Sequence, residues 1–322
     1  MPKLEIVPFS EEHLDGAGRL LAERHAMHRS VEALLPQAFE DPGRASEELE
    51  TALGADDASG AAALRNGALV GYLVGAPRDT EAWGNENVWF ELAGHATDTA
   101  ETIRDLYAFA AERWVEEGRR RHYALVPIHD PALVEAWFRL GFGQQQAHAV
   151  QEVGPREARV PDGFEIRAPA EHDVDNLLEV DLALPRHHRA SPVFSDRPLP
   201  SEVEQRNEWA ETLAGTEEKV LIGLRDGAPV AVWAVAPATL SSQHTGLGLP
   251  ERASYLAFAS TLPQIRGSGI GVALTDASFA WAAEQGYESM VTDWRVANLL
   301  ASRFWPRRGF RTTFLRLYRS IP

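Results

Sequence analysis

An internal repeat is the feature that most constrains what this sequence can fold into. Leu-Glu-Ile at residues 4–6 recurs as Phe-Glu-Ile at residues 164–166. Leu-Arg-Asn-Gly-Ala-Leu-Val at residues 64–70 recurs as Leu-Arg-Asp-Gly-Ala-Pro-Val at residues 224–230. Both pairs are 160 residues apart (164 minus 4, 224 minus 64), and a shared offset is hard to obtain by chance. The chain is therefore interpreted as a duplication of one structural unit.

A third pair of segments locates the boundary between the copies. Trp-Phe-Arg-Leu-Gly-Phe at residues 137–142 recurs as Trp-Pro-Arg-Arg-Gly-Phe at residues 305–310, an offset of 168, so the second copy is longer by a net eight residues (168 minus 160). Residues 154–163 between the copies combine glycine and proline, which break periodic structure, with charges that keep the segment solvated. We predict two domains, residues 1–157 and residues 158–322.

The order of elements is similar in the two halves. Residues 4–7 and 164–167 are typical of opening strands, and acidic stretches such as 173–180 are typical of the helices that follow. Each half then has a tight-turn signal between apolar runs, Asn-Gly at 66–67 and Asp-Gly at 226–227. The pattern predicts an α/β fold in which each half has a central mixed sheet flanked by helices.

A glycine-rich turn joins a predicted strand to a predicted helix in the second half. The strand is the apolar run 255–261, and the turn at 263–271 reads Pro-Gln-Ile-Arg-Gly-Ser-Gly-Ile-Gly. Glycines allow a ligand to approach the backbone, and the start of a helix presents unpaired N–H groups and a positive dipole end. The spacing fits neither a Gly-x-Gly-x-x-Gly dinucleotide turn nor a P-loop. The turn predicts an anion site suited to a diphosphate.

This turn resembles the acetyl-CoA pyrophosphate loop of the GNAT superfamily of N-acetyltransferases, whose core pattern is Arg/Gln-x-x-Gly-x-Gly/Ala. Arg266, Gly269 and Gly271 fill that pattern. Asn298 followed by residues 305–310 resembles the second signature of the family, an Asn and then Tyr-x-x-x-Gly-Phe. With the repeat, the chain is similar in layout to tandem, two-domain members of the family such as mycothiol synthase. The resemblance implies acetyl-CoA as co-substrate, held by Ser260, Thr261, Leu262, Arg266, Gly267, Ser268, Gly269, Ile270, Gly271 and Asn298.

The resemblance also implies a reaction. An acetyl group would pass from acetyl-CoA to a primary amine of a small molecule by direct attack in a ternary complex, with a backbone N–H within 258–262 stabilising the oxyanion. The position of the usual Tyr acid holds Trp305, whose indole does not titrate usefully. Proton return must then come from water or another group, and Tyr255 is one candidate. Tyr255 also stands near the position of the usual Glu base, so the nearest carboxylates along the two strands, Glu251 and Asp293, are the other catalytic candidates. The alternative is a catalytically inactive acyl-CoA-binding sensor or scaffold.

The first half departs from the family pattern at the loop. Its equivalent segment, residues 94–99, reads Gly-His-Ala-Thr-Asp-Thr and lacks the loop glycines. Asp98 adds a negative charge near the position of a phosphate, and Asp130 stands at the position equivalent to Asn298 (298 minus 168). We therefore expect a degenerate, structural domain that does not bind CoA in the usual way.

Histidines also recur between the halves. His28 is the repeat equivalent of His188 (188 minus 160), which follows His187 in the proline-rich segment 184–200. Repetition favours a structural role for these side chains. His25 and His28 have the spacing of a metal pair but no nearby third ligand, so no metal site is predicted.

Charge and composition exclude several classes of function. The 322 residues carry a formal charge of −16 (31 minus 47), which argues against binding nucleic acid and against a relative that uses aminoacyl-tRNA. The absence of cysteine removes disulfides and thiolate chemistry. No run approaches the roughly 18 apolar residues of a membrane span, and the start lacks the apolar core of a signal peptide. We expect a cytoplasmic protein with no membrane partner, as a monomer or homodimer.

Overall fold

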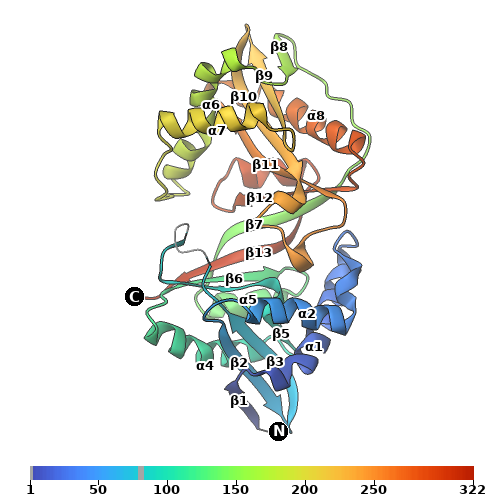
Figure 1. Cartoon of the computed structure of the whole chain (residues 1–322), viewed down its shortest axis with the longest axis vertical. Helices are drawn as coiled ribbons and strands as arrows, with labels where there is room; N and C mark the ends of the chain where they lie inside the picture. Colours follow the sequence, from blue (N-terminus) through green and yellow to red (C-terminus); the bar gives the residue numbers. More distant parts are fainter. Residues whose placement is uncertain (1–2, 79–82) are drawn as a thin grey trace. The chain divides into compact units, whose positions relative to one another are not determined.

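A computed structural model describes residues 3–78 and 83–322 of the chain. The chain divides into two compact units (Figure 1), which are described separately. Unit 1 comprises Met1–His148, Gly246–Pro250 and Thr312–Pro322, and unit 2 comprises Ala149–Thr245 and Glu251–Arg311. Within the described ranges, no helix is both long enough and apolar enough to cross a bilayer.

Unit 1 contains an antiparallel sheet in the order β1-β2-β3-β5. Its elements are β1 (Leu4–Pro8), α1 (Leu14–Val31), α2 (Pro42–Leu53), β2 (Ser59–Arg65), β3 (Ala68–Gly75), β4 (Asn87–Phe90), β5 (His95–Thr97), α4 (Thr102–Glu116), β6 (Arg121–Pro127) and α5 (Pro131–Arg139). The predicted turn between β2 and β3 is present, with φ of +53° at Asn66 and +78° at Gly67. Two successive positive φ angles are what a tight hairpin turn requires, and Asn-Gly tolerates them.

Alternation along β3 explains how helices cover both faces of this sheet. Tyr72 and Val74 are buried in a cluster with residues of α1 and α2. Gly71, which points to the opposite face, would place a Cβ 3.1 Å from Thr102 and 3.3 Å from Leu106 of α4. The period of two along a strand therefore places α1 and α2 on one face and α4 on the other.

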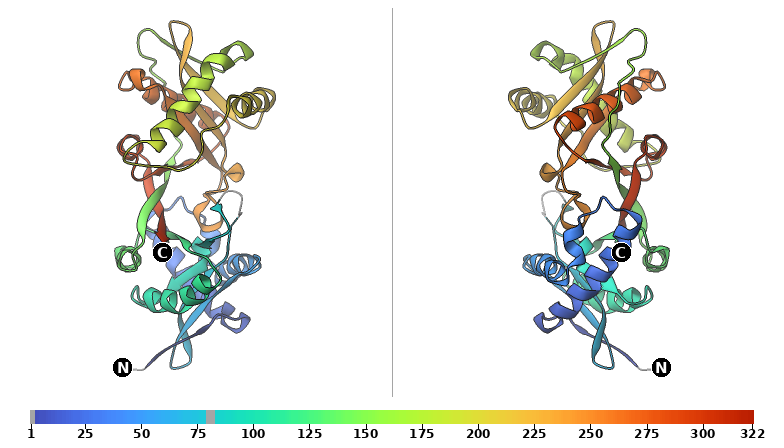
Figure 2. Two further views of the ribbon diagram at one scale, coloured as in Figure 1. Left: turned by 90° about the vertical axis from the view of Figure 1, so that its left-hand side faces the viewer. Right: turned by 90° about the vertical axis from the view of Figure 1, so that its right-hand side faces the viewer.

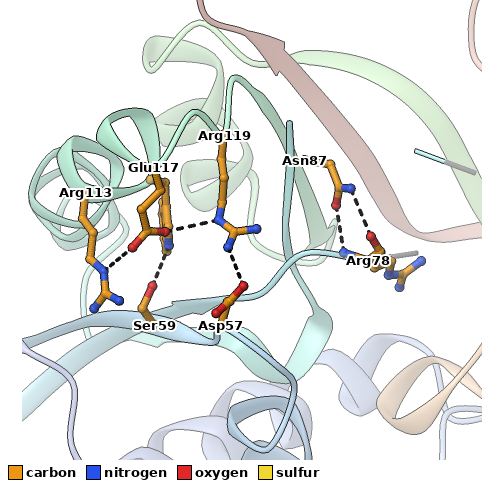
Figure 3. A network of polar contacts seen from close by, with 8 residues as sticks. Asp57, Ser59, Arg78, Asn87, Arg113, Glu117 and Arg119 are labelled. Atoms are coloured by element: carbon orange, nitrogen blue, oxygen red, sulfur yellow. Dashed lines mark hydrogen bonds and ion pairs between the residues drawn. The ribbon is translucent and has the colours of Figure 1, made fainter. Parts of the chain in front are cut away.

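Polar contacts join the end of α4 to the start of β2 (Figure 3). The indole Nε1 of Trp114 donates a 2.8 Å hydrogen bond to Ser59, and Glu117 accepts from Arg113 at 2.7 Å and from Arg119 at 3.2 Å. Exposed ion pairs of this kind contribute about 0–1 kcal/mol each. Trp114 is 1% exposed, so its hydrogen bond satisfies a donor that burial would otherwise leave without water.

Unit 2 has a mixed sheet that positions the candidate site. Its elements are β8 (Phe164–Arg167), α6 (Val174–Arg189), α7 (Glu202–Ala214), β9 (Lys219–Arg225), β10 (Ala228–Pro237), β11 (Ala253–Thr261), α8 (Ile270–Glu284), β12 (Ser289–Arg295) and α9 (Ala301–Arg307). The strand order is β12-β11-β10-β9-β8. β11 is parallel to β12, and the pairs from β11 to β8 are antiparallel.

The helices of unit 2 cover opposite faces of this sheet. Ile222 of β9 and Val232 of β10 are buried in a cluster with side chains of α6. Gly223, which follows Ile222 in β9 and faces the opposite side of the sheet, would place a Cβ 2.7 Å from Ile270 of α8. Figure 2 shows α6 and α8 on opposite sides of these strands. The start of α8 therefore packs on one face of the sheet, and α6 packs on the other face.

Two strands cross the boundary that the repeat predicts. β13 (Arg311–Ser320) pairs antiparallel with β6 of unit 1, from Phe314 opposite Pro127 to Ser320 opposite Arg121. β7 (Gly143–Glu152) begins in unit 1, and its last four residues belong to unit 2. The spatial units consequently differ at their edges from residues 1–157 and 158–322, because hydrogen-bond partners rather than sequence position decide where a strand belongs.

Candidate active site

β11 and β12 separate partway along their length. In the described part of the chain, their parallel pairs run only from Ala253 opposite Ser289 to Tyr255 opposite Val291. One residue further on, the hydroxyl of Thr292 donates to the carbonyl of Leu256 at 3.0 Å. Beyond this vertex β11 continues to Thr261 and keeps its pairing with β10 alone. The edge of β11 that faces β12 is thereby opened to a ligand.

A β-bulge interrupts β11 just past the vertex. Val235 of β10 lies opposite Leu256, but Ala234 lies opposite Phe258, so Ala257 is the extra residue. Ala257 is exposed. A bulge leaves its extra residue outside the ladder and redirects the neighbouring backbone groups. The irregularity falls one residue before the 258–262 segment expected to supply an oxyanion donor.

The glycine-rich turn begins α8 with backbone that only glycine adopts readily. Pro263–Ile265 form a short 3₁₀ turn, Gly267 and Gly269 have φ of +84° and +93°, and α8 begins at Ile270. A Cβ at Gly271 would lie 3.3 Å from the ring of Trp233. The first N–H groups of α8 have no acceptor within the helix. The geometry is that of an anion site at a helix N-terminus.

The structure uses several of the predicted cofactor residues for packing. The hydroxyl of Ser260 donates to the carbonyl of Val180 in α6 at 2.6 Å, and the N–H of Leu262 donates to Val230 at 3.0 Å. Ile270 is 1% exposed. Thr261, Ser268, Gly269 and Gly271 are half-buried, whereas Arg266 and Gly267 are exposed. Ser260 and Ile270 are therefore committed to packing, whereas a ligand can reach the loop from Arg266 to Gly269.

A cavity of about 490 Å³ lies between α6 and the segment that precedes the loop glycines. Its lining consists of Glu179, Ala183, Arg186, His187, Leu262, Pro263, Gln264 and Arg266. Arg266 has no ion-pair partner among the residues that the structure describes, and burial lowers the pKa of its guanidinium. Arg266 thus belongs both to the loop and to the lining of the cavity, where it is a cation without an ion-pair partner among the described residues.

Asn298 is buried, with 3% of its surface exposed. Its Oδ1 accepts the N–H groups of Leu300 at 3.1 Å and Ala301 at 3.3 Å, at the start of α9. Its Oδ1 also lies 3.1 Å from Nε2 of His187, and its Nδ2 lies 3.2 Å from Nε2 of His188. The side chain predicted to bind the cofactor is therefore already hydrogen-bonded through both of its polar atoms.

The imidazole ring of His188, which contacts Asn298, is neutral near pH 7. Burial, together with the charges of Arg295 and His187, lowers its pKa to about 4. A neutral ring can accept the N–H of Asn298 at Nε2. The structural role that the repeat suggested for this histidine agrees with these contacts.

Two of the three predicted catalytic side chains meet at the vertex. The hydroxyl of Tyr255 donates to Asp293 at 3.0 Å. His244, which the sequence did not single out, is 2% exposed, and its ring centroid lies 5.2 Å from that of Tyr255. Burial lowers the pKa of His244. Its place depends on an irregular segment between β10 and β11, which carries no sequence signal for such a contact.

Glu251 and Trp305 lie apart from this pair. Glu251 is exposed in the turn before β11. Trp305 is 6% exposed. Its ring packs edge-to-face against that of Phe310, with the ring centroids 5.6 Å apart. The tryptophan at the position of the usual acid is thus part of the core of unit 2.

The equivalent segment of unit 1 has no glycine cradle. Gly94 is buried in a short 3₁₀ turn, and α4 begins only at Thr102. Asp98 accepts a 2.7 Å hydrogen bond from Arg65. Unit 1 therefore has the carboxylate of Asp98, paired with Arg65, at the position where unit 2 has the exposed backbone of the glycine loop.

Comparison with known proteins gives a family match for part of the chain and a likeness of fold for the whole. Residues 184–310 match the model of the Acetyltransferase (GNAT) family. The chain is similar to the GCN5-related N-acetyltransferase from Sphaerobacter thermophilus, with 12% identity over 98% of this chain and 95% of that chain and a TM-score of 0.58. It is also similar to a fungal glucosamine N-acetyltransferase region within a multi-domain beta-N-acetylglucosaminidase (13% identity, 99% and 38% coverage, TM-score 0.52). A tandem GNAT protein from the clavulanic acid biosynthesis pathway is 15% identical (99% and 98% coverage, TM-score 0.49).

No curated protein matches the chain significantly. The likeness to the Sphaerobacter enzyme spans both units, so the fold of both halves is the expected mixed α/β arrangement. The glycine loop, the vertex of β11 and β12, and Asn298 all fall inside the matched residues. Residues 184–310, which hold the glycine loop, therefore match the model of the GNAT acetyltransferase family, and over the whole chain the solved structures show a likeness of fold.

Proposed function

We propose that the protein is an acyl-CoA-dependent N-acetyltransferase that transfers an acetyl group from acetyl-CoA to a primary amine of a small molecule. The observation that carries the proposal is the coincidence of the family match with the separated strands and the glycine loop. Loop N–H groups from Gly267 to Gly271 and the guanidinium of Arg266 would hold the diphosphate. The open edge of β11 would hydrogen-bond the pantetheine amides.

The chemistry needs no covalent enzyme intermediate. A neutral amine attacks the thioester carbonyl, so that a C–N bond forms, the C–S bond breaks, and the sulfur leaves with the electron pair. The bulge at Ala257 brings exposed backbone near the vertex, where an N–H group can stabilise the oxyanion. Tyr255 and Asp293 form the proton-transfer pair: the carboxylate takes the proton that nitrogen loses, and the hydroxyl donates to sulfur.

The first half, in this proposal, is a scaffold that has lost the cofactor site. The ion pair of Asp98 with Arg65 and the missing loop glycines support this division of labour. The acidic charge of the chain favours encounter with a cationic amine over a neutral one.

A second candidate is an acyl-CoA-binding sensor or scaffold without turnover. It is favoured by Trp305, which occupies the position of the usual acid and is buried in the core. The two candidates differ in one observable, the release of free CoA thiol.

Calorimetric titration with acetyl-CoA and a thiol-release assay over a panel of primary amines test the proposal. Ser268→Glu places a carboxylate inside the half-buried loop and should abolish binding, whereas Thr216→Glu adds the same charge at an exposed loop of unit 2 and should not. Binding with thiol release establishes the transferase. Binding without release for any amine supports the sensor, and no binding refutes both.

A further inference from the structure

The cavity beside the loop has a charge balance that a single side chain can change. Glu179 accepts hydrogen bonds from both terminal nitrogens of Arg186, at 2.6 and 3.2 Å, so these two charges cancel. Arg266 remains as an unpaired cation among the described residues. The lining therefore carries a net charge of +1 when His187 is neutral and +2 when His187 is protonated.

Asn298 determines which nitrogen of His187 carries the proton when the ring is neutral. The amide orientation is set because two backbone N–H groups donate to its Oδ1, which identifies that atom as the oxygen. An amide oxygen only accepts, so His187 donates through Nε2. Nδ1 of His187 has no protein partner in the part of the chain that the structure describes, and it is not a buried atom.

We propose that His187 binds the diphosphate of acyl-CoA as a second cationic wall opposite the glycine loop, so that protonation of this histidine strengthens cofactor binding. The proposal rests on the proposed function, because it names a further contact for the same cofactor. Asn298 is then a positioning residue that holds His187, instead of a direct cofactor ligand. A diphosphate diester carries two negative charges, which the cavity balances only with His187 protonated.

The charged and titratable groups around His187 come from three elements. Its own helix contributes Glu179, Arg186 and His188; the end of β12 contributes Arg295, whose charge acts on His188; and the loop segment contributes Arg266. His188 stays neutral, and Glu179 and Arg186 compensate one another. His187 is thus the group in this set whose protonation a bound diphosphate favours, which links cofactor binding to proton uptake.

The test uses dephospho-CoA as the probe, because the 3′-phosphate of CoA itself titrates near about pH 6. Affinity is measured by calorimetry on the full chain at pH 8.0 and pH 6.0, with circular dichroism at both. Binding to the wild type should be about three- to fivefold tighter at pH 6.0. His187→Gln should bind equally at both values, and His187→Lys should bind tightly at both.

Two further variants make the test specific. His172→Gln is the matched control, since that side chain is 76% exposed in the same unit, and it should retain the full pH response. Asn298→Ala keeps His187 but removes its orienting acceptor, so it should lose most of the response. A positioning role is refuted if this variant responds like the wild type.

The outcomes separate the two proposals. If dephospho-CoA binds but its affinity does not change with pH, or if His187→Gln keeps the change, the inference about His187 is wrong while the transferase proposal stands. If neither acetyl-CoA nor dephospho-CoA binds at either pH, the proposed function fails, and the inference fails with it.

Discussion

Acid should weaken unit 1 more than unit 2, because burial keeps five histidines neutral among the residues of unit 1 that the structure describes. Burial lowers the pKa of His28 and His95 to about 3 and that of His25, His122 and His129 to about 4. In the unfolded chain a histidine titrates near about 6.5. Between these values the unfolded state binds more protons, so the free energy of unfolding falls as pH falls.

The size of the effect follows from the two pKa values. Between pH 7.5 and pH 5.5, one histidine with a folded pKa near 4 costs slightly more than about 1 kcal/mol, and five together cost on the order of 6 kcal/mol. Half of that sum, about 3 kcal/mol if water enters and the structure relaxes, is still a large part of the stability of a domain at the lower end of the roughly 5–15 kcal/mol range. Unit 2 has only His188 and His244 with lowered pKa values among its described residues.

Hydrogen exchange followed by mass spectrometry at pH 7.5, 6.5 and 5.5 would measure this, once corrected for intrinsic exchange. Protection in α1 and β6 should fall more than protection in β10 and α8. His122→Gln should reduce the loss of stability of unit 1 between pH 7.5 and 5.5 by about 1 kcal/mol, whereas the exposed His172→Gln should not change that loss. Protection in unit 1 that holds to pH 5.5, or falls no faster than in unit 2, would refute the reasoning.

Three further predictions concern unit 2. Gly269→Ala should lower stability by about 1 kcal/mol and weaken acetyl-CoA binding, because φ is +93° there; Gly154→Ala, with open space around it, should do neither, and equal melting temperatures for both would contradict this. Trp305→Ala should cost about 3–5 kcal/mol in urea unfolding, since the ring is in the core, and a loss below about 1 kcal/mol would mean that the ring is not packed there. Tyr255→Phe should lower kcat about 10²-fold with an unchanged Kd for acetyl-CoA, and unaltered turnover would remove Tyr255 from proton transfer.

Features that depend on neighbouring residues could be predicted from the sequence. The turn at Asn66 and Gly67 has the two positive φ angles that Asn-Gly tolerates. The glycine-rich turn likewise lies immediately before a helix, as predicted, and Gly267 and Gly269 in it have positive φ. In both places a local conformational preference decides the backbone, so a short stretch of sequence is sufficient.

Features that depend on distant partners could not be predicted in the same way. His187 and Asn298 are 111 residues apart, and no pattern in either segment indicates that their side chains meet. β13 is an ordinary strand by its sequence, yet its pairing with β6 places it in unit 1. The repeat alone assigns every residue to its own half, because it records the ancestry of a segment and not its hydrogen-bond partner.

The equivalent turns of the two halves show what an amide adds to a helix cap. Asp130 and Asn298 each accept two backbone N–H groups at the start of the following helix, so the cap is retained in both halves. Only the amide also donates an N–H, which reaches His188, whereas the equivalent His28 stacks on His129 with ring centroids 4.7 Å apart. The exchange of Asp for Asn therefore changes the contact with the histidine and not the cap. The half with that contact is also the half with the glycine loop, as expected if the amide serves the cofactor by holding the end of α6.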